Sequence, residues 1–154
     1  MKSMKRAPQT GSVLVEAAFT LLTLFVFLFG IVEAGRFFQV QQFLTDAARE
    51  GARVAVAPLS QTTTLATMAE IQTAIQQFLD AAAIKNATPA VDCVNLTTGA
   101  DIASNSTCTG IVCPAACGTR VTVSAPYQIM TLAMFSNLSI TLKGKALMRN
   151  ETSP

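Results

Sequence analysis

An uncharged apolar run near the N-terminus is the feature that most constrains what this chain can form. Residues 17–32 contain no Asp, Glu, Lys or Arg. As a helix they rise about 24 Å, slightly less than a hydrocarbon core of roughly 30 Å, and Val13–Val15 complete the span if Glu16 is included. Only 13% of the 154 residues are charged, about half the usual share in a soluble domain. We therefore expect a membrane-spanning helix.

The residues before this run predict its orientation. Lys2, Lys5 and Arg6 precede it without an acidic residue among them, which favours a cytoplasmic N-terminus and an outer C-terminal part. A secretory signal peptide cut near Ala34 is a second interpretation. It is less favoured because its apolar region would exceed the usual 7–15 residues and the helical pattern continues through the cut.

Glu16 is the exception within the apolar segment. A carboxylate inside a spanning helix costs about 2.5–3.5 kcal/mol at mid-membrane and usually has a partner there. A simple single-pass anchor leaves this cost unexplained. If the chain is cut after Gly11, the new α-amino group of Ser12 is a cation that Glu16 of the same or a neighbouring subunit can neutralise.

The helical pattern continues beyond the membrane. A continuous helix from Ser12 to Val56 would be roughly 68 Å long, and Pro58 marks its end or a linker just after it. Apolar or small residues recur every three or four positions and predict a buried stripe. They are Phe37, Val40, Leu44, Ala47, Gly51 and Val54.

The N-terminal third resembles a known family. The segment Gly-Ser-Val-Leu-Val-Glu at 11–16, between a basic leader and an apolar helix, resembles the processing site of type IV pilins and pseudopilins. Residues 11–56 resemble TadE-like proteins, the pseudopilins or minor pilins of tight-adherence (Tad) pili. The most specific part of this resemblance is the stem segment of Ala47, Ala48, Arg49, Glu50, Gly51, Ala52 and Arg53.

The resemblance implies a function and partners. It implies a prepilin peptidase that cuts between Gly11 and Ser12, and Glu16 as an assembly carboxylate. It also implies an inner-membrane assembly platform and contacts with other pilins and pseudopilins through the N-terminal helix. The chain would take part in assembly or priming of a Tad pilus for adhesion and biofilm formation. Its location would be the bacterial inner membrane, with a periplasmic C-terminal domain and incorporation into an extracellular pilus as a further possibility.

Beyond Pro58 the pattern predicts one helix and a few strands. Thr63 or Thr64 can cap a helix that reaches about Lys85. Its apolar stripe is Leu65, Met68, Ile71, Ile75, Phe78, Leu79 and Ala82. A short strand is expected at 91–96, with loops at 86–89 and 95–110, and two half-buried strands at 120–127 and 138–148. The connection 128–137, with Ile129, Met130, Leu132, Met134 and Phe135, is expected to form a short helix or a packed loop.

The four cysteines all lie on the predicted outer side. An even number in an oxidising compartment predicts two disulfides among Cys93, Cys108, Cys113 and Cys117. Three connectivities are open. A zinc site of four thiolates is less favoured, because export disfavours free thiolates and the spacings do not form two separate pairs.

Composition excludes several classes of function. The chain contains no His, which excludes Ser-His and Cys-His nucleophile pairs and His-ligated metals. No basic cluster follows residue 6, so we expect no nucleic-acid partner. Asp92, Asp101, Glu70 and Asp80 have no charged partner nearby in sequence, and each is expected to be solvated. We expect no enzyme activity, no cofactor and no metal site.

The sequence thus predicts an α+β protein. A leader at 1–11 precedes a transmembrane and stem helix at 12–57, and a small disulfide-bonded domain with one further helix and a short antiparallel sheet follows at 58–154. The lipid bilayer is a partner of the helix. The alternative function is a single-pass, membrane-anchored periplasmic binding module.

Overall fold

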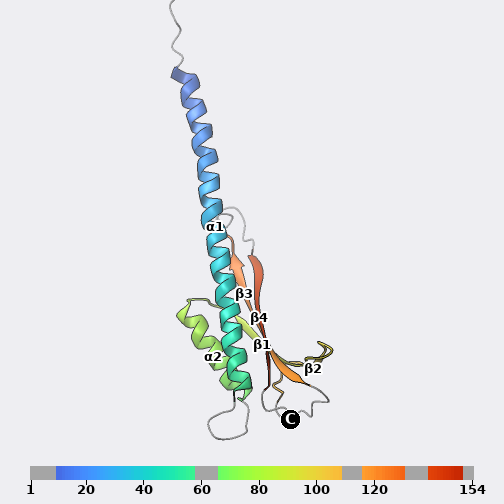
Figure 1. Cartoon of the computed structure of the whole chain (residues 1–154). Helices are drawn as coiled ribbons and strands as arrows, with labels where there is room; N and C mark the ends of the chain where they lie inside the picture. Colours follow the sequence, from blue (N-terminus) through green and yellow to red (C-terminus); the bar gives the residue numbers. More distant parts are fainter. Residues whose placement is uncertain (1–9, 58–65, 109–115, 131–138, 151–154) are drawn as a thin grey trace, which may run out of the picture. The chain divides into compact units, whose positions relative to one another are not determined.

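The structure is a computed structural model that describes residues 10–57, 66–108, 116–130 and 139–150 (Figure 1). Its elements are α1 (Thr10–Val56), α2 (Met68–Ala81), β1 (Thr88–Asn95), β2 (Asp101–Ala103), β3 (Cys117–Gln128) and β4 (Ser139–Arg149). The chain divides into two compact units, with the boundary inside α1 between Arg36 and Phe37.

The first unit contains the N-terminal part of α1. Its apolar window has a mean hydropathy of 2.3 and none of it is buried. This helix is long and apolar enough to cross a membrane, as the uncharged run predicts. The hydroxyls of Thr20 and Thr23 donate hydrogen bonds of 2.9 Å to the carbonyls of Glu16 and Phe19. The two polar side chains are therefore satisfied within the helix, as a lipid environment requires.

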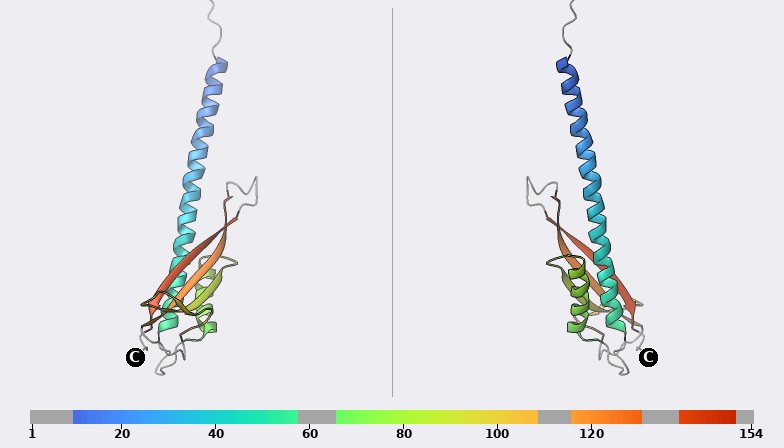
Figure 2. Two further views of the ribbon diagram at one scale, coloured as in Figure 1. Left: turned by 90° about the vertical axis from the view of Figure 1, so that its right-hand side faces the viewer. Right: turned by 90° about the vertical axis from the view of Figure 1, so that its left-hand side faces the viewer.

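The second unit is built on a four-stranded antiparallel sheet in the order β2-β1-β3-β4. Strands β3 and β4 cross the C-terminal part of α1 obliquely, and α2 lies beside the last turns of α1 (Figure 2). Both helices pack on the same face of the sheet, because one apolar core includes residues from all of these elements. Among its buried members are Leu44, Ala48, Ile71, Ile75, Leu79, Val91, Val121, Val123 and Leu142.

Helix α2 is confirmed as an element, but its predicted bounds are wrong. It begins after Thr67, whose hydroxyl accepts the Glu70 N–H while the Glu70 carboxylate accepts the Thr67 N–H. This capping box fixes the start of the helix, so residues 66 and 67 are not helical. The helix ends at Ala81 rather than at Lys85, because Ala83 adopts a left-handed conformation with φ 56°. Thr63, Thr64 and Leu65 lie outside the described residues.

Strand β1 begins earlier than the sequence predicts, and β2 was not predicted. Residues 88 and 89 belong to β1 because they pair with Ser124 and Val123 of β3. Strand β2 lies within the stretch predicted as a loop. The turn before it is closed by Asn95, whose side-chain oxygen accepts the N–H groups of Thr97 and Thr98, and by Gly99 at φ 71°. The polar residues of this stretch predict only a loop, but they connect β1 and β2 in a short hairpin.

The two C-terminal strands are confirmed. The predicted face of β3 is buried at Val121, Val123, Ala125 and Tyr127. In β4 the alternation is weaker, because Leu142 is buried while Ile140 remains 37% exposed. Of the connection that follows β3, Ile129 packs against the core and Met130 is exposed. Leu132, Met134 and Phe135 lie outside the described residues.

Candidate assembly helix

The proposed processing motif lies in the first turns of α1. Gly11, Ser12 and Glu16 are all exposed, and a Cβ placed on Gly11 would meet no atom within 4 Å. Glu16 makes no ion pair with any described residue. Glu16 follows Ser12 by four positions, about one helical turn or 6 Å of rise. The exposed carboxylate is thus available to a nearby cation.

The segment that follows exposes large apolar side chains. Among them Leu14 is 71% exposed, Phe27 68% and Ile31 72%. Such a continuous exposed apolar surface needs lipid or other protein chains around it. The run ends at an ion pair of 3.6 Å between Glu33 and Arg36.

The stem segment has the opposite pattern, because its small residues point inward. Ala47, Ala48 and Ala52 are fully buried. A Cβ on Gly51 would lie 2.6 Å from the Ile75 side chain, so glycine allows α1 and α2 to approach closely. These small residues of the stem segment therefore serve the packing of the domain on its own helix.

The charged residues of the stem segment point outward. Arg49 pairs with Asp46 at 3.2 Å, and Arg53 forms a two-point hydrogen bond with Glu50. The hydrogen bonds from Arg53 lower the pKa of Glu50 and the same bonds raise the pKa of Arg53. Exposed pairs of this kind contribute little to stability, and they leave the outer face of the stem with balanced charge.

The sheet contacts α1 closely at Gly144. A Cβ at this position would lie 2.2 Å from the backbone carbonyl atoms of Leu44, so only glycine fits. Beside it, the Gln41 side-chain amide donates a hydrogen bond of 3.0 Å to the Lys143 carbonyl. The rings of Phe37 and Tyr127 add an edge-to-face contact with centroids 5.9 Å apart. These contacts hold β4 and β3 against the helix.

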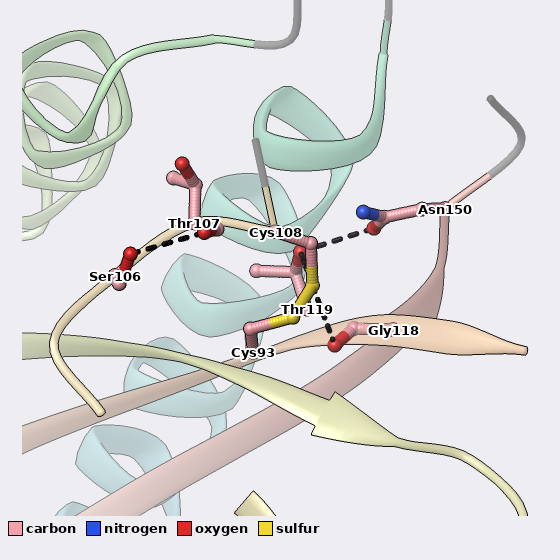
Figure 3. Close-up of a disulfide and its surroundings, with 7 residues drawn as sticks. All are labelled: Cys93, Ser106, Thr107, Cys108, Gly118, Thr119 and Asn150. Atoms are coloured by element: carbon pink, nitrogen blue, oxygen red, sulfur yellow. Dashed lines mark hydrogen bonds between the residues drawn. A yellow bond between two sulfur atoms is a disulfide. The ribbon is translucent and has the colours of Figure 1, made fainter. Parts of the chain in front are cut away.

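A disulfide closes the other end of the sheet. Cys93 of β1 is bonded to Cys108, and both are buried (Figure 3). This confirms that the domain is disulfide-bonded and excludes a zinc site made of all four thiolates, because sulfurs in a disulfide are not thiolates. Cys117 is also disulfide-bonded, and Cys113 lies outside the described residues.

The buried polar groups near the disulfide are paired. The Thr119 hydroxyl donates to the Asn150 side-chain oxygen at 3.0 Å (Figure 3). The Asn150 N–H donates to the Cys117 carbonyl. Asn150 is only 4% exposed. The end of β4 is therefore fixed to β3 beside the disulfide.

The interpretation of Asp92 and Asp101 as merely solvated is wrong. Arg120 of β3 forms ion pairs with both, at 3.1 Å and 2.6 Å. Its hydrogen bonds to Asp101 and Asp92 raise the pKa of Arg120. Asp92 also accepts the Asn105 N–H at 3.1 Å. The cluster connects three strands, and only the register of the sheet reveals it, since the partners are far apart in sequence.

The described residues contain no group of three or more Asp, Glu or Cys side chains placed to hold a metal ion. The geometry defines the class of small protein to which the chain belongs. In this class an N-terminal apolar helix that can anchor in a membrane is followed by a disulfide-bonded α+β domain. Residues 11–53 match the family model of TadE-like proteins, which confirms the resemblance and identifies this part of the chain as TadE-like. No curated protein and no solved structure gives a significant match.

Proposed function

We propose that the chain is a minor pilin or pseudopilin that takes part in the assembly or priming of a Tad-type pilus, and so in adhesion and biofilm formation. The observation that carries the proposal is the TadE-like match, which covers both the exposed apolar segment and the buried stem. In this proposal residues 1–11 are a leader, 12–57 form the membrane and stem helix, and 58–154 form the periplasmic domain.

The first step is removal of the leader. A prepilin peptidase cuts between Gly11 and Ser12 and leaves a mature chain that begins at Ser12. The exposure of Gly11 supports this proposal, because no described atom lies where a side chain at this position would be. The basic leader keeps the cut on the cytoplasmic side of the inner membrane.

The second step uses Glu16. Cleavage creates an α-amino group about one helical turn away, and the same group of a neighbouring subunit is equally suited. An ion pair between the two would remove two unpaired charges from lipid. The helix then leaves the bilayer with other pilins and pseudopilins at the assembly platform.

The test is a comparison of Glu16→Ala with Glu16→Asp in cells that make the pilus. We expect Glu16→Ala to be cleaved after Gly11 and to form its disulfides, but to enter pilus complexes and support surface attachment less well. The shorter Asp should be intermediate. Mass spectrometry of the N-terminus, non-reducing electrophoresis and co-purification with pilus components measure these three properties.

Two results would contradict the proposal. A mature protein that still begins at Met1 or Lys2, or one that begins at Gly35, would exclude the processing step. A Glu16→Ala protein that joins pilus complexes at the unmutated level would favour a membrane-anchored binding module, for which the carboxylate has no assembly role.

A further inference from the structure

The cations of the second unit are distributed unevenly. Each arginine at positions 36, 49, 53 and 120 pairs with an acidic side chain. The described cations without an ion pair are Lys85, Lys143, Lys145 and Arg149, and three of these lie on β4. The unpaired positive charge is thus concentrated on one strand.

The three cations of strand β4 lie on one face of the strand. Leu142 and Gly144 face the core, so the alternating positions Lys143, Lys145 and Arg149 face away from both helices. They are exposed, and so is Leu147 at 53%. We call the exposed side chains of these four residues the cationic face. Its members are spaced by two residues, about 6.8 Å along the strand.

The neighbouring strands do not neutralise this face. On β3, the residues opposite Lys143 and Lys145 are Ser124 and Thr122, which carry no charge. The nearest acidic side chains on the sheet are Asp92 and Asp101, and both already bond to Arg120. Positive charge on β4 therefore remains available to another molecule.

A second copy of this chain is a poor match for the cationic face. Five of its seven described acidic residues beyond the apolar run pair with arginines. The exceptions lie on α2, where Glu70 closes the capping box and Asp80 accepts a hydrogen bond from Gln76. These two side chains are ten residues apart, about 15 Å along the helix, and form no acidic patch.

Anionic lipid fits less well than protein. Recognition of lipid headgroups usually uses four to eight clustered cations. On the cationic face an apolar side chain, Leu147, lies between Lys145 and Arg149, as in protein interfaces where an apolar centre is surrounded by a polar rim. We infer that the cationic face docks an acidic surface of a different protein, which is another pilus component if the proposed function holds.

The test places a photocrosslinking amino acid at position 147 of the full-length protein in cells that make the pilus. Mass spectrometry then identifies the crosslinked peptide. The expected result is a peptide with several Asp or Glu residues from another pilus protein. A peptide of this same chain, a crosslink to lipid alone, or no crosslink would overturn the inference.

Charge reversal provides the matched control. Lys143→Glu with Lys145→Glu should lower the crosslinking yield roughly tenfold, whereas Lys85→Glu should leave it unchanged. Reversing the acidic residues of the crosslinked peptide should restore the yield. An intact Cys93–Cys108 disulfide shows that each variant has folded, and equal yields from the double variant and the Lys85 control would overturn the inference.

The outcome also separates this inference from the proposed function. An acidic peptide from a protein outside the pilus machinery would support the docking surface and contradict the pilus role. Normal pilus incorporation of the Lys143 and Lys145 variant without loss of the crosslink would contradict the docking surface alone.

Discussion

The two parts of α1 differ in what surrounds them, and their side chains differ accordingly. Up to Arg36 the helix carries large apolar residues that are exposed, such as Leu22 and Phe27. From Phe37 to Val56 its fully buried apolar residues are Leu44 and four alanines, which pack into one core with the sheet and α2. Large exposed side chains suit a surface that lipid or other subunits must cover, whereas small buried ones allow close approach within the same chain.

A matched pair of substitutions on α1 gives the sharpest test of this comparison. Leu44 is fully buried and Leu22 is 62% exposed. We expect Leu44→Ala to lower the free energy of unfolding of the domain by about 2–5 kcal/mol, and Leu22→Ala to change it by less than about 0.5 kcal/mol. Urea unfolding in detergent can be followed by the fluorescence of Tyr127, the single tyrosine, which is buried in this domain. Equal losses would show that both parts of the helix stabilise the domain.

Removing the disulfide tests whether the apolar segment depends on the domain. The Cys93–Cys108 bond closes a loop with a sequence separation of 15, and its loss in Cys93→Ala with Cys108→Ala should cost about 2–4 kcal/mol. The domain should unfold at lower urea, while the helical circular dichroism of the membrane segment persists in detergent. If the domain unfolded and the helical circular dichroism of the membrane segment were lost at the same urea concentration, the membrane segment would depend on the domain for its structure.

Gly144 tests the close contact of β4 with α1. Gly144→Ala places a Cβ against the backbone of Leu44, which cannot move as a flexible side chain can. We expect a loss of about 1–3 kcal/mol in the unfolding free energy. The control is Gly35→Ala on α1, where a Cβ meets no atom within 4 Å. An equal effect of the two variants on urea unfolding would mean that the sheet does not approach the helix this closely.

The sequence predicts well those features of the two parts of α1 that repeat along the chain. The membrane helix and the buried stripe of the stem follow from local periodicity, because each residue's environment repeats with the helical turn. The faces of β3 and β4 follow from alternation in the same way. The start of α2 was predicted wrongly, although the Thr67–Glu70 capping box is visible in the sequence, because Thr63 and Thr64 offered competing caps.

Features that depend on strand register were not predicted. The ion pairs of Arg120 with Asp92 and Asp101 join residues that are 19 or more positions apart. Strand β2 exists because a polar turn brings Asp101 back beside Val94. The spacing of the four cysteines likewise left three connectivities open. Each of these depends on which chain segments pair, and composition carries little information about pairing.

The smallest expected effect concerns the capping box, which stabilises α2 without deep burial. The hydrogen bond from the Thr67 N–H, and then that from its hydroxyl, lower the pKa of Glu70 below the ordinary value of 4.5. A carboxylate with a lowered pKa stabilises the folded state above the unfolded pKa and loses this contribution as the pH falls through the folded one.

We therefore expect Glu70→Gln to lower the urea midpoint slightly at neutral pH, with the difference from the unmutated protein disappearing as the pH falls well below 4.5. Thr67→Ala keeps the backbone donor and should retain most of the pH dependence of the unmutated protein. Tyr127 fluorescence measures all three proteins. If Thr67→Ala removes the pH dependence as completely as Glu70→Gln does, the hydroxyl rather than the backbone N–H is the main cause of the lowered pKa.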